Sequence, residues 1–234
     1  MADIKIPSNL IDVAITLTRS VDYVYGSRVD GDIIEFGTFR GTTARFIAQN
    51  MKSWHQTLEK KGRLNQMTEK RLYLFDSFKG LPQSNAKQDL ENILVQTGVW
   101  AAGTCNGLTS EELTALILQT GLSREDFFIY DGWFRATVST LPSTARFACI
   151  HVDCDLYQST IDALTPLFSR GQIMRGAVIL FDDWNFSAAD DAVGERAAWI
   201  ELVAKFSISF EGMGYYGAYG YRVLVKKYSG MLER

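Results

Sequence analysis

Five short, largely apolar runs alternate along the chain with longer stretches of helical periodicity. The apolar runs cover residues 32–36, 72–75, 127–130, 147–152 and 177–181. Helical patterns between several of these runs cover residues 42–51, 111–119 and 160–168. Buried parallel strands have such continuous apolar character, because helices cover both faces of their sheet. The alternation of strand and helix therefore predicts a doubly wound α/β fold with a parallel sheet.

The two ends of the chain depart from this alternation. A broad apolar face at residues 8–25 predicts a helix that precedes the sheet and caps it. β-Forming residues at 207–210 and 221–225 predict a final antiparallel pair, joined by the Gly/Tyr-rich segment 212–220. The weakly periodic segment 83–107 follows a strand end on the ligand side of the sheet, where long loops often act as lids.

Composition and charge exclude several classes of protein. A length of 234 residues fits one α/β domain with a helical segment at residues 1–28, and 47% hydrophobic residues supply an ordinary core. The net charge of -3 and the lack of a dense basic stripe argue against a nucleic-acid partner. Three cysteines without a Cys-x-x-Cys pair indicate a reducing compartment. Because no stretch resembles a signal peptide or a spanning helix, we expect a soluble, cytoplasmic protein without a membrane partner.

A glycine turn, EFGTFRG at residues 35–41, joins the first strand to its helix. Glycine allows the backbone to approach a ligand closely, and the N-terminus of the following helix favours negative charge. The Gly-x-Gly-x-x-Gly spacing of dinucleotide-binding proteins is absent, so this turn suits a nucleoside that carries an amino acid better than a pyrophosphate. An ordinary strand–helix turn is the alternative interpretation.

Acidic residues follow the second and third strands as well. Asp76 is placed to accept hydrogen bonds from ribose hydroxyls, as an acid at this position does in related sheets. The long spacing from Gly37 requires an insertion at about residues 53–69. Asp131 closes the third strand, where it could meet an adenine amino group. Either aspartate could instead cap a turn.

Two acidic clusters follow the fourth and fifth strands. Asp153 and Asp155 flank Cys154 after one strand, and Asp182 and Asp183 follow the other. The carboxyl ends of parallel strands meet at one crevice, so these four acids should lie close together. Their mutual repulsion requires neutralisation, for which a divalent cation with hard oxygen ligands is the obvious candidate. Helix capping is the alternative role of such aspartates.

Five motifs occur in order between residues 31 and 184, namely GDIIEFGTFRGT at 31–42, FDSFKGLP at 75–82, GWF at 132–134, HVDCDLYQST at 151–160 and FDDW at 181–184. With them the chain resembles the macrocin O-methyltransferase family, S-adenosylmethionine-dependent enzymes that methylate sugar hydroxyls of natural products. The resemblance implies a class I methyltransferase (Rossmann-like) fold, with a seven-stranded, mostly parallel sheet, a C-terminal antiparallel pair and an N-terminal helical cap.

The resemblance also implies magnesium dependence and a role for each acid. Asp153, Asp182 and Asp183 are expected to bind Mg²⁺, and Asp155 to act as the base. The residues expected to contact S-adenosylmethionine are Glu35, Gly37, Thr38, Gly41, Thr42, Asp76, Ser77, Asp131, Gly132 and Trp133. Since Mg²⁺ takes about six oxygen ligands, three carboxylates leave room for water and two vicinal hydroxyls of a small-molecule or glycan acceptor.

Other interpretations of the same residues stay open. Catechol-like acceptors also offer vicinal oxygens to Mg²⁺, and a non-catalytic S-adenosylmethionine-binding domain would need the glycine turn but not the four acids. A nicotinamide dehydrogenase is disfavoured by the glycine spacing. His151 lies on the same strand as Asp153, but a satisfied core histidine is favoured over a catalytic one. The oligomeric state stays open, a homo-oligomer being one option.

Overall fold

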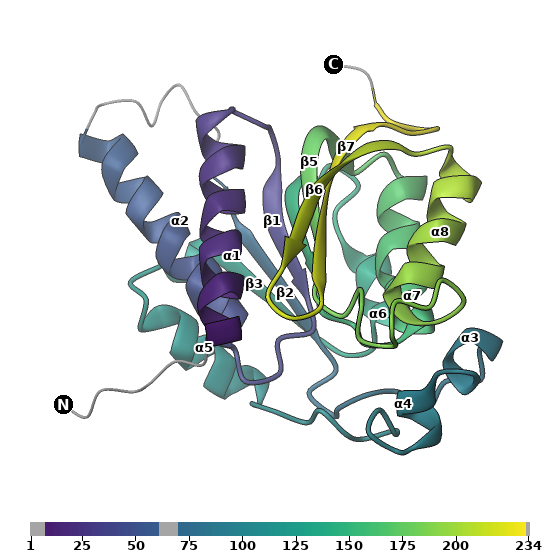
Figure 1. Cartoon of the computed structure of the whole chain (residues 1–234). Coiled ribbons are helices and arrows are strands. Elements are labelled where there is room, and N and C mark those ends of the chain that lie inside the picture. Colours follow the sequence, from purple (N-terminus) through teal and green to yellow (C-terminus); the bar gives the residue numbers. More distant parts are fainter. Residues whose placement is uncertain (1–7, 61–69, 233–234) are drawn as a thin grey trace.

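The computed structural model describes residues 8–60 and 70–232 of the chain. Within them, seven strands form one sheet in the order β3-β2-β1-β4-β5-β7-β6 (Figure 1). Strands β1 to β5 pair in parallel, whereas β7 is antiparallel to both β5 and β6. The strands are β1 Asp32–Phe36, β2 Leu72–Asp76, β3 Phe127–Asp131, β4 Phe147–Val152, β5 Ile173–Phe181, β6 Ser209–Tyr216 and β7 Gly220–Lys227. The predicted parallel sheet with a C-terminal antiparallel pair is confirmed.

Helices cover both faces of this sheet, as Figure 1 shows. One face carries α1 Ser8–Gly26, α2 Thr42–Lys60 and α5 Ser110–Leu118. The other carries α6 Phe134–Thr137, α7 Tyr157–Ser169 and α8 Gly194–Phe206. Two short helices, α3 Lys87–Leu90 and α4 Ile93–Gln96, lie beyond the carboxyl ends of the strands (Figure 1). No helix within the described ranges has both the length and the apolar character needed to cross a bilayer.

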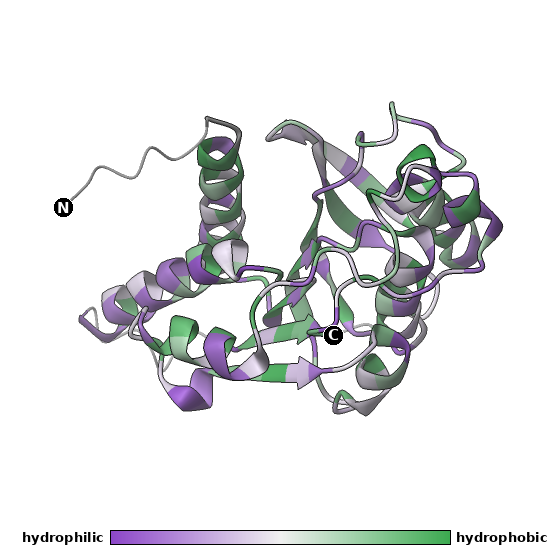
Figure 2. Cartoon of the chain, turned by 90° about the horizontal axis from the view of Figure 1, so that it is seen from below, coloured by the Kyte–Doolittle hydropathy of each residue, from purple (hydrophilic) through white to green (hydrophobic). Residues whose placement is uncertain are grey.

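The strands are apolar throughout because alternate side chains fill two separate cores. On β1, Ile33 packs with residues of α1 and α2, while Ile34 and Phe36 pack with residues of α7 and α8. All three side chains are fully buried. Figure 2 shows the largely hydrophobic strands between the two helical layers. This two-sided burial stabilises the fold through the hydrophobic effect and leaves the strand ends for polar residues.

Helix α2 is longer than its sequence pattern predicts. It runs to Lys60, so the predicted insertion at 53–69 is helical over residues 53–60, and residues 61–69 lie outside the described part. Helix α1 supplies a partner for this extension. The Trp54 ring stacks on Tyr25 with centroids 5.2 Å apart, and Trp54 Nε1 donates a hydrogen bond to Asp22 Oδ1 at 2.7 Å.

The Gly/Tyr-rich segment 212–220 is mostly strand, which corrects its prediction as a connecting segment. Its glycines make room for tyrosines of the paired strand. A Cβ atom at Gly212 would lie 2.1 Å from the hydroxyl oxygen of Tyr221, and one at Gly220 would lie 2.4 Å from Cζ of Tyr216. The pairing of β6 with β7 also shifts register between Gly212 and Gly214. Glycine here permits close ring packing and a bulge.

Candidate active site

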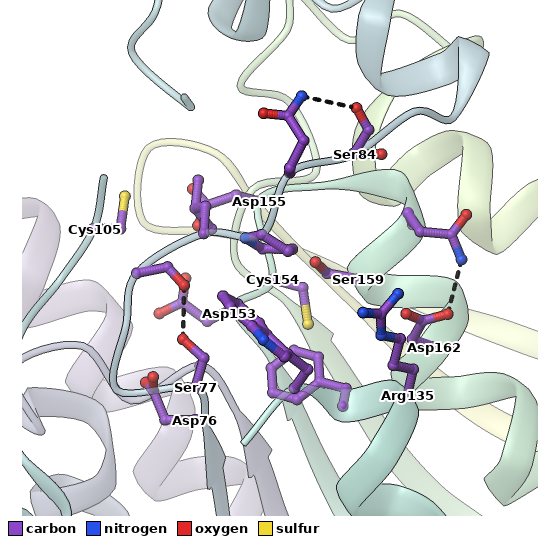
Figure 3. Close-up of a pocket in the computed structure, with 18 of the residues that line it drawn as sticks. Asp76, Ser77, Ser84, Cys105, Arg135, Asp153, Cys154, Asp155, Ser159 and Asp162 are labelled. Carbon is purple, nitrogen blue, oxygen red and sulfur yellow. Dashed lines mark hydrogen bonds between the residues drawn. The ribbon is translucent and has the colours of Figure 1, made fainter. Parts of the chain in front are cut away.

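A cavity of about 460 Å³ opens at the carboxyl ends of the parallel strands (Figure 3). This volume is in the range of pockets that hold cofactors and small ligands. The polar residues that line it include Asp76, Ser77, Gln83, Ser84, Arg135, Asp153, Asp155, Gln158, Ser159 and Asp162. Figure 3 shows Asp76 and Ser77 on the same side of the cavity as Asp153. The acids at the ends of β2 and β4 therefore share one cavity with Gly37 and Phe39 of the glycine turn, whereas Asp182 and Asp183 after β5 do not line it.

Asp76 organises the glycine turn. Its Oδ2 accepts hydrogen bonds from the backbone N–H of Thr38 (2.7 Å), the hydroxyl of Thr38 (2.9 Å) and the N–H of Phe39 (3.1 Å). Its Oδ1 accepts one bond, from the N–H of Phe78 at 2.8 Å. A carboxylate oxygen has two lone pairs, so Oδ1 retains the capacity to accept one more donor. The turn-capping role named above as an alternative is therefore observed, and contact with a ribose stays a prediction.

The predicted cofactor-contacting residues divide into two groups. Gly37, Asp76, Ser77 and Trp133 line the cavity. The others do not line it, namely Glu35, Thr38, Gly41, Thr42, Asp131 and Gly132. Thr38 bonds to Asp76, and the N–H of Gly132 donates to the carbonyl oxygen of Asp76 at 2.9 Å. For the residues away from the cavity, contact with a cofactor remains a prediction.

The glycines of the turn allow close contacts within the protein. A Cβ atom at Gly37 would lie 1.9 Å from the carbonyl oxygen of Asp153, and one at Gly41 would lie 2.5 Å from a methyl carbon of Leu116 on α5. Both residues have positive φ, 86° and 69°. We predicted that these glycines let the backbone approach a ligand. In the structure they let it approach the end of β4 and helix α5 instead. The glycine turn and the first acidic cluster are therefore in direct contact.

Three of the four predicted acids converge. Single carboxylate oxygens of Asp153, Asp155 and Asp183 all lie within 4.8 Å of one another. Burial, and after it the charge of Asp182, raises the pKa of Asp153 well above its ordinary value, and the same causes raise the pKa of Asp155 to about 7. Asp155 has φ of +58°, in the left-handed region where non-glycine residues cluster at functional sites. These groups resist ionisation together, which favours a cation between them.

The fourth acid, Asp182, faces a buried histidine. His151 is fully buried, and its Nδ1 lies 2.8 Å from Oε1 of the equally buried Glu35. Its Nε2 lies 3.8 Å from Asp182 Oδ1 and has no hydrogen-bond partner among the described residues. Burial lowers the pKa of His151, but its interactions with Asp182 and Glu35 outweigh this and raise the pKa well above the ordinary value. The favoured role as a satisfied core histidine therefore holds for Nδ1, which is paired with Glu35. The other ring nitrogen, Nε2, faces Asp182.

Asp89, a buried acid of the predicted lid, was not anticipated from the sequence. Its Oδ1 accepts from the N–H of Tyr157 at 2.7 Å and its Oδ2 from the N–H of Gln158 at 3.1 Å, the first two residues of α7. A carboxylate there satisfies free N–H groups and stabilises the helix dipole. Segment 83–107 is thereby attached to the helix that follows Asp155. Its movement as a lid stays a prediction.

A seven-stranded sheet of this order, with an acid-rich cavity at the carboxyl ends of its parallel strands, defines a protein of the class I methyltransferase fold. Residues 14–198 match the macrocin-O-methyltransferase (TylF) family, and the chain belongs to this family.

A relative in Streptomyces olivaceus, 8-demethyl-8-(2,3-dimethoxy-alpha-L-rhamnosyl)-tetracenomycin-C 4'-O-methyltransferase, is 32% identical over 181 residues, which are 76% of this chain. The match spans 62% of that relative's length. Among solved structures, the O-methyltransferase NovP superposes with a TM-score of 0.71 at 23% identity over 92% of this chain and 79% of its own. The O-methyltransferase TomG from Streptomyces achromogenes, solved in complex with SAM, superposes with a TM-score of 0.54 at 15% identity over 97% and 93% of the two chains. Both structures support the fold.

Proposed function

We propose that the chain is an S-adenosylmethionine-dependent, Mg²⁺-assisted O-methyltransferase that acts on a sugar hydroxyl of a glycosylated natural product. Membership of the macrocin-O-methyltransferase family supports the reaction, and the relative named for a rhamnosyl tetracenomycin supports a glycosylated acceptor. The observation that carries the proposal is the contact of the glycine turn with the acidic cluster at Gly37 and Asp153. A methyl donor at the turn and an acceptor at the acids would lie side by side.

The acidic cluster fits a hard divalent cation. Its three close carboxylates supply oxygen ligands, and Asp183 Oδ2 is buried without a hydrogen-bond partner among the described residues. When bound, Mg²⁺ would favour loss of a proton from a nearby hydroxyl, and S-adenosylmethionine would supply an electrophilic methyl group. We propose Asp153, Asp182 and Asp183 as the residues that hold the cation, which requires Asp182 to turn its carboxylate from His151 toward the cluster.

Asp155 is the proposed base. Its pKa of about 7 suits proton transfer near neutral pH, because a general base works best when its pKa is close to the operating pH. Its carboxylate lies within 4.8 Å of those of Asp153 and Asp183, so it would be close to an acceptor hydroxyl that binds beside them. Cys105 and Gln158 line the same cavity as Asp155, and we place the acceptor there.

The proposed cofactor site lies beside the acids, at Gly37 of the glycine turn and at Asp76. Asp76 Oδ1 has one remaining lone pair for a ribose hydroxyl, and Ser77 and Trp133 line the adjacent wall. Calorimetry with S-adenosylmethionine and with NAD tests this assignment, and tight binding of NAD would contradict it. Methylation assays on glycosides and catechols, each with Mg²⁺ and with a chelator, test the reaction. Transfer to catechols alone would refute the sugar hydroxyl.

Asp182→Asn separates the cation from the cofactor. We expect the variant to lose Mg²⁺-dependent turnover, because one proposed ligand loses its charge, while its affinity for S-adenosylmethionine stays near that of the wild type. Asp190→Asn in the same loop is the matched control, since its carboxylate is exposed and caps a local turn at Ala192. Wild-type turnover of Asp182→Asn would exclude this acid from the cation site.

A further inference from the structure

Glu195 connects the two acidic clusters through their backbones. It lies in the first turn of α8, and its side chain is only 1% exposed. Its Oε1 accepts a hydrogen bond from the N–H of Cys154 at 3.2 Å, and its Oε2 accepts one from the N–H of Asp183 at 3.0 Å. Cys154 separates Asp153 from Asp155 after β4, and Asp183 follows β5. One carboxylate thus holds both acid-bearing strand ends.

Burial of the Glu195 carboxylate destabilises the fold unless both of its oxygens accept hydrogen bonds. A buried carboxylate beside other carboxylates is destabilised by desolvation and by repulsion. Its hydrogen bonds with the two N–H groups offset part of this cost, because buried polar groups that keep hydrogen-bond partners avoid the penalty of unsatisfied ones. A glutamine of the same shape has only one acceptor oxygen, and its amide N–H would oppose the second backbone N–H. Only an acid of this length satisfies both strand ends at once.

The start of α8 also lies close to the first cluster. A Cβ atom at Gly194 would lie 3.6 Å from the carbonyl oxygen of Asp155, which is ordinary van der Waals contact, and Gly194 has φ of +60°. The helix therefore begins beside the segment to which Glu195 is hydrogen-bonded. Helix α8 in turn packs into the core through Trp199 and Leu202, which are buried. The helix that carries Glu195 is thus anchored in the core.

We infer that Glu195 is a positioning residue that sets the separation of the two acid-bearing strand ends, and with it the spacing of Asp153, Asp155 and Asp183. This inference rests on the cation site of the proposed function. Glu195 is not among the acids whose oxygens converge, and each of its own oxygens is directed at a backbone N–H group, so we assign it a role through the aspartates rather than as a ligand. Partners that orient metal ligands typically change metal affinity or activity by about 10- to 100-fold when replaced.

Two variants and one control test the inference. Glu195→Gln keeps the shape and removes one acceptor, whereas Glu195→Asp keeps the charge but is one methylene too short to reach both N–H groups. Glu201→Gln is the matched control on the same helix, where the exposed Glu201 accepts a hydrogen bond from the hydroxyl of Tyr157. Three quantities are measured: amide hydrogen exchange at Cys154 and Asp183 in metal-free protein, Mg²⁺ affinity by calorimetry, and S-adenosylmethionine affinity.

We expect faster exchange at Cys154 or Asp183 in both Glu195 variants and an Mg²⁺ dissociation constant raised about 10- to 100-fold. Affinity for S-adenosylmethionine should not change, and Glu201→Gln should match the wild type in all three measurements. If Glu195→Gln does not fold, Glu195→Asp carries the test.

Wild-type amide exchange and Mg²⁺ affinity in both Glu195 variants would overturn the inference. The inference would also be overturned if Glu195→Asp bound Mg²⁺ like the wild type while Glu195→Gln bound it more weakly. The charge of residue 195, and not its reach to both N–H groups, would then determine the Mg²⁺ affinity. A wild-type protein that does not bind Mg²⁺ would instead refute the proposed cation site itself.

Discussion

Replacing Asp155 with Asn is expected to stabilise the metal-free protein above neutral pH, although it removes the proposed base. The folded structure holds the Asp155 carboxyl where burial and the charge of Asp182 oppose its ionisation. Asparagine has nearly the same shape, cannot ionise, and tolerates the positive φ of this position. The substitution therefore removes an electrostatic penalty without a change of backbone or packing. The role proposed for Asp155 as a base would therefore come at the expense of stability.

The raised pKa of Asp155 sets the magnitude and the pH window. A rise from 3.8 to about 7 corresponds to about 4 kcal/mol at 1.36 kcal/mol per pKa unit. Below pH 3.8 the carboxyl is protonated in both the folded and the unfolded chain, so it contributes no penalty. As the pH rises toward 7, only the unfolded chain ionises freely, and the folded state loses stability relative to it. Above the folded-state pKa the penalty is complete and constant.

Thermal unfolding of the wild type and Asp155→Asn in a chelator, between about pH 5 and pH 8.5, measures this difference. At 2–4 °C per kcal/mol for a chain of this size, we expect the variant to unfold roughly 10 °C higher at pH 8. The gain should shrink toward pH 5. Saturating Mg²⁺ should also reduce it, because a cation at the cluster stabilises the ionised wild type more than the variant.

The exposed Glu125 offers the matched control for this series. It lies in the 3₁₀ turn Arg124–Asp126, where Glu125→Gln should leave the unfolding temperature unchanged at every pH. An Asp155→Asn variant that is no more stable than the wild type at pH 8 without metal would refute the reasoning. A stability gain that does not depend on pH would refute it too, since packing would then be the cause.

Two further substitutions test other contacts of the site. Gly37→Ala would place a methyl group 1.9 Å from the Asp153 carbonyl oxygen, so we expect this variant to unfold more than roughly 10 °C below the wild type. Gly98→Ala controls for backbone strain, because Gly98 has a similar positive φ but open space around it. Equal unfolding temperatures for the two variants would contradict the close contact. Asp89→Asn should lower stability by about 1 kcal/mol through loss of the α7 cap and speed proteolysis within 83–107. An unchanged cleavage rate would show that Asp89 does not anchor this segment.

The buried strands could be predicted from the sequence because two-sided burial leaves a continuous apolar signal. Strand β5 begins at Ile173, earlier than predicted. Its first residues were not recognised as a strand because Arg175 and Gly176 interrupt the apolar pattern where the register with β4 shifts. Helix α8 was not predicted because its apolar residues do not form a single face. Ala198, Trp199 and Leu202 are buried, while Ile200 is half exposed. A helix pattern is visible only when one stripe alone is apolar.

The proximity of Asp153, Asp155 and Asp183 could also be predicted, since β4 and β5 are neighbours and their carboxyl ends meet. The direction in which each carboxylate points could not be predicted from the sequence. Asp182 turns toward His151 because that ring is held by Glu35 from a third strand, and Glu195 comes from a helix with no sequence signal for its role. These contacts join residues far apart in the chain, and local patterns contain no information on them.

The glycine bulge of β6 bears on how the protein behaves at high concentration. As the edge strand of the sheet, β6 has backbone N–H and C=O groups that a strand of another molecule could pair with. The register shift at Gly212 and Gly214 bends this edge, and the ion pair of Glu211 with Lys226 places charges beside it. Bent and charged edges are poor templates for strand addition. The exposed, tyrosine-rich hairpin can therefore remain at the surface without seeding aggregation through its backbone.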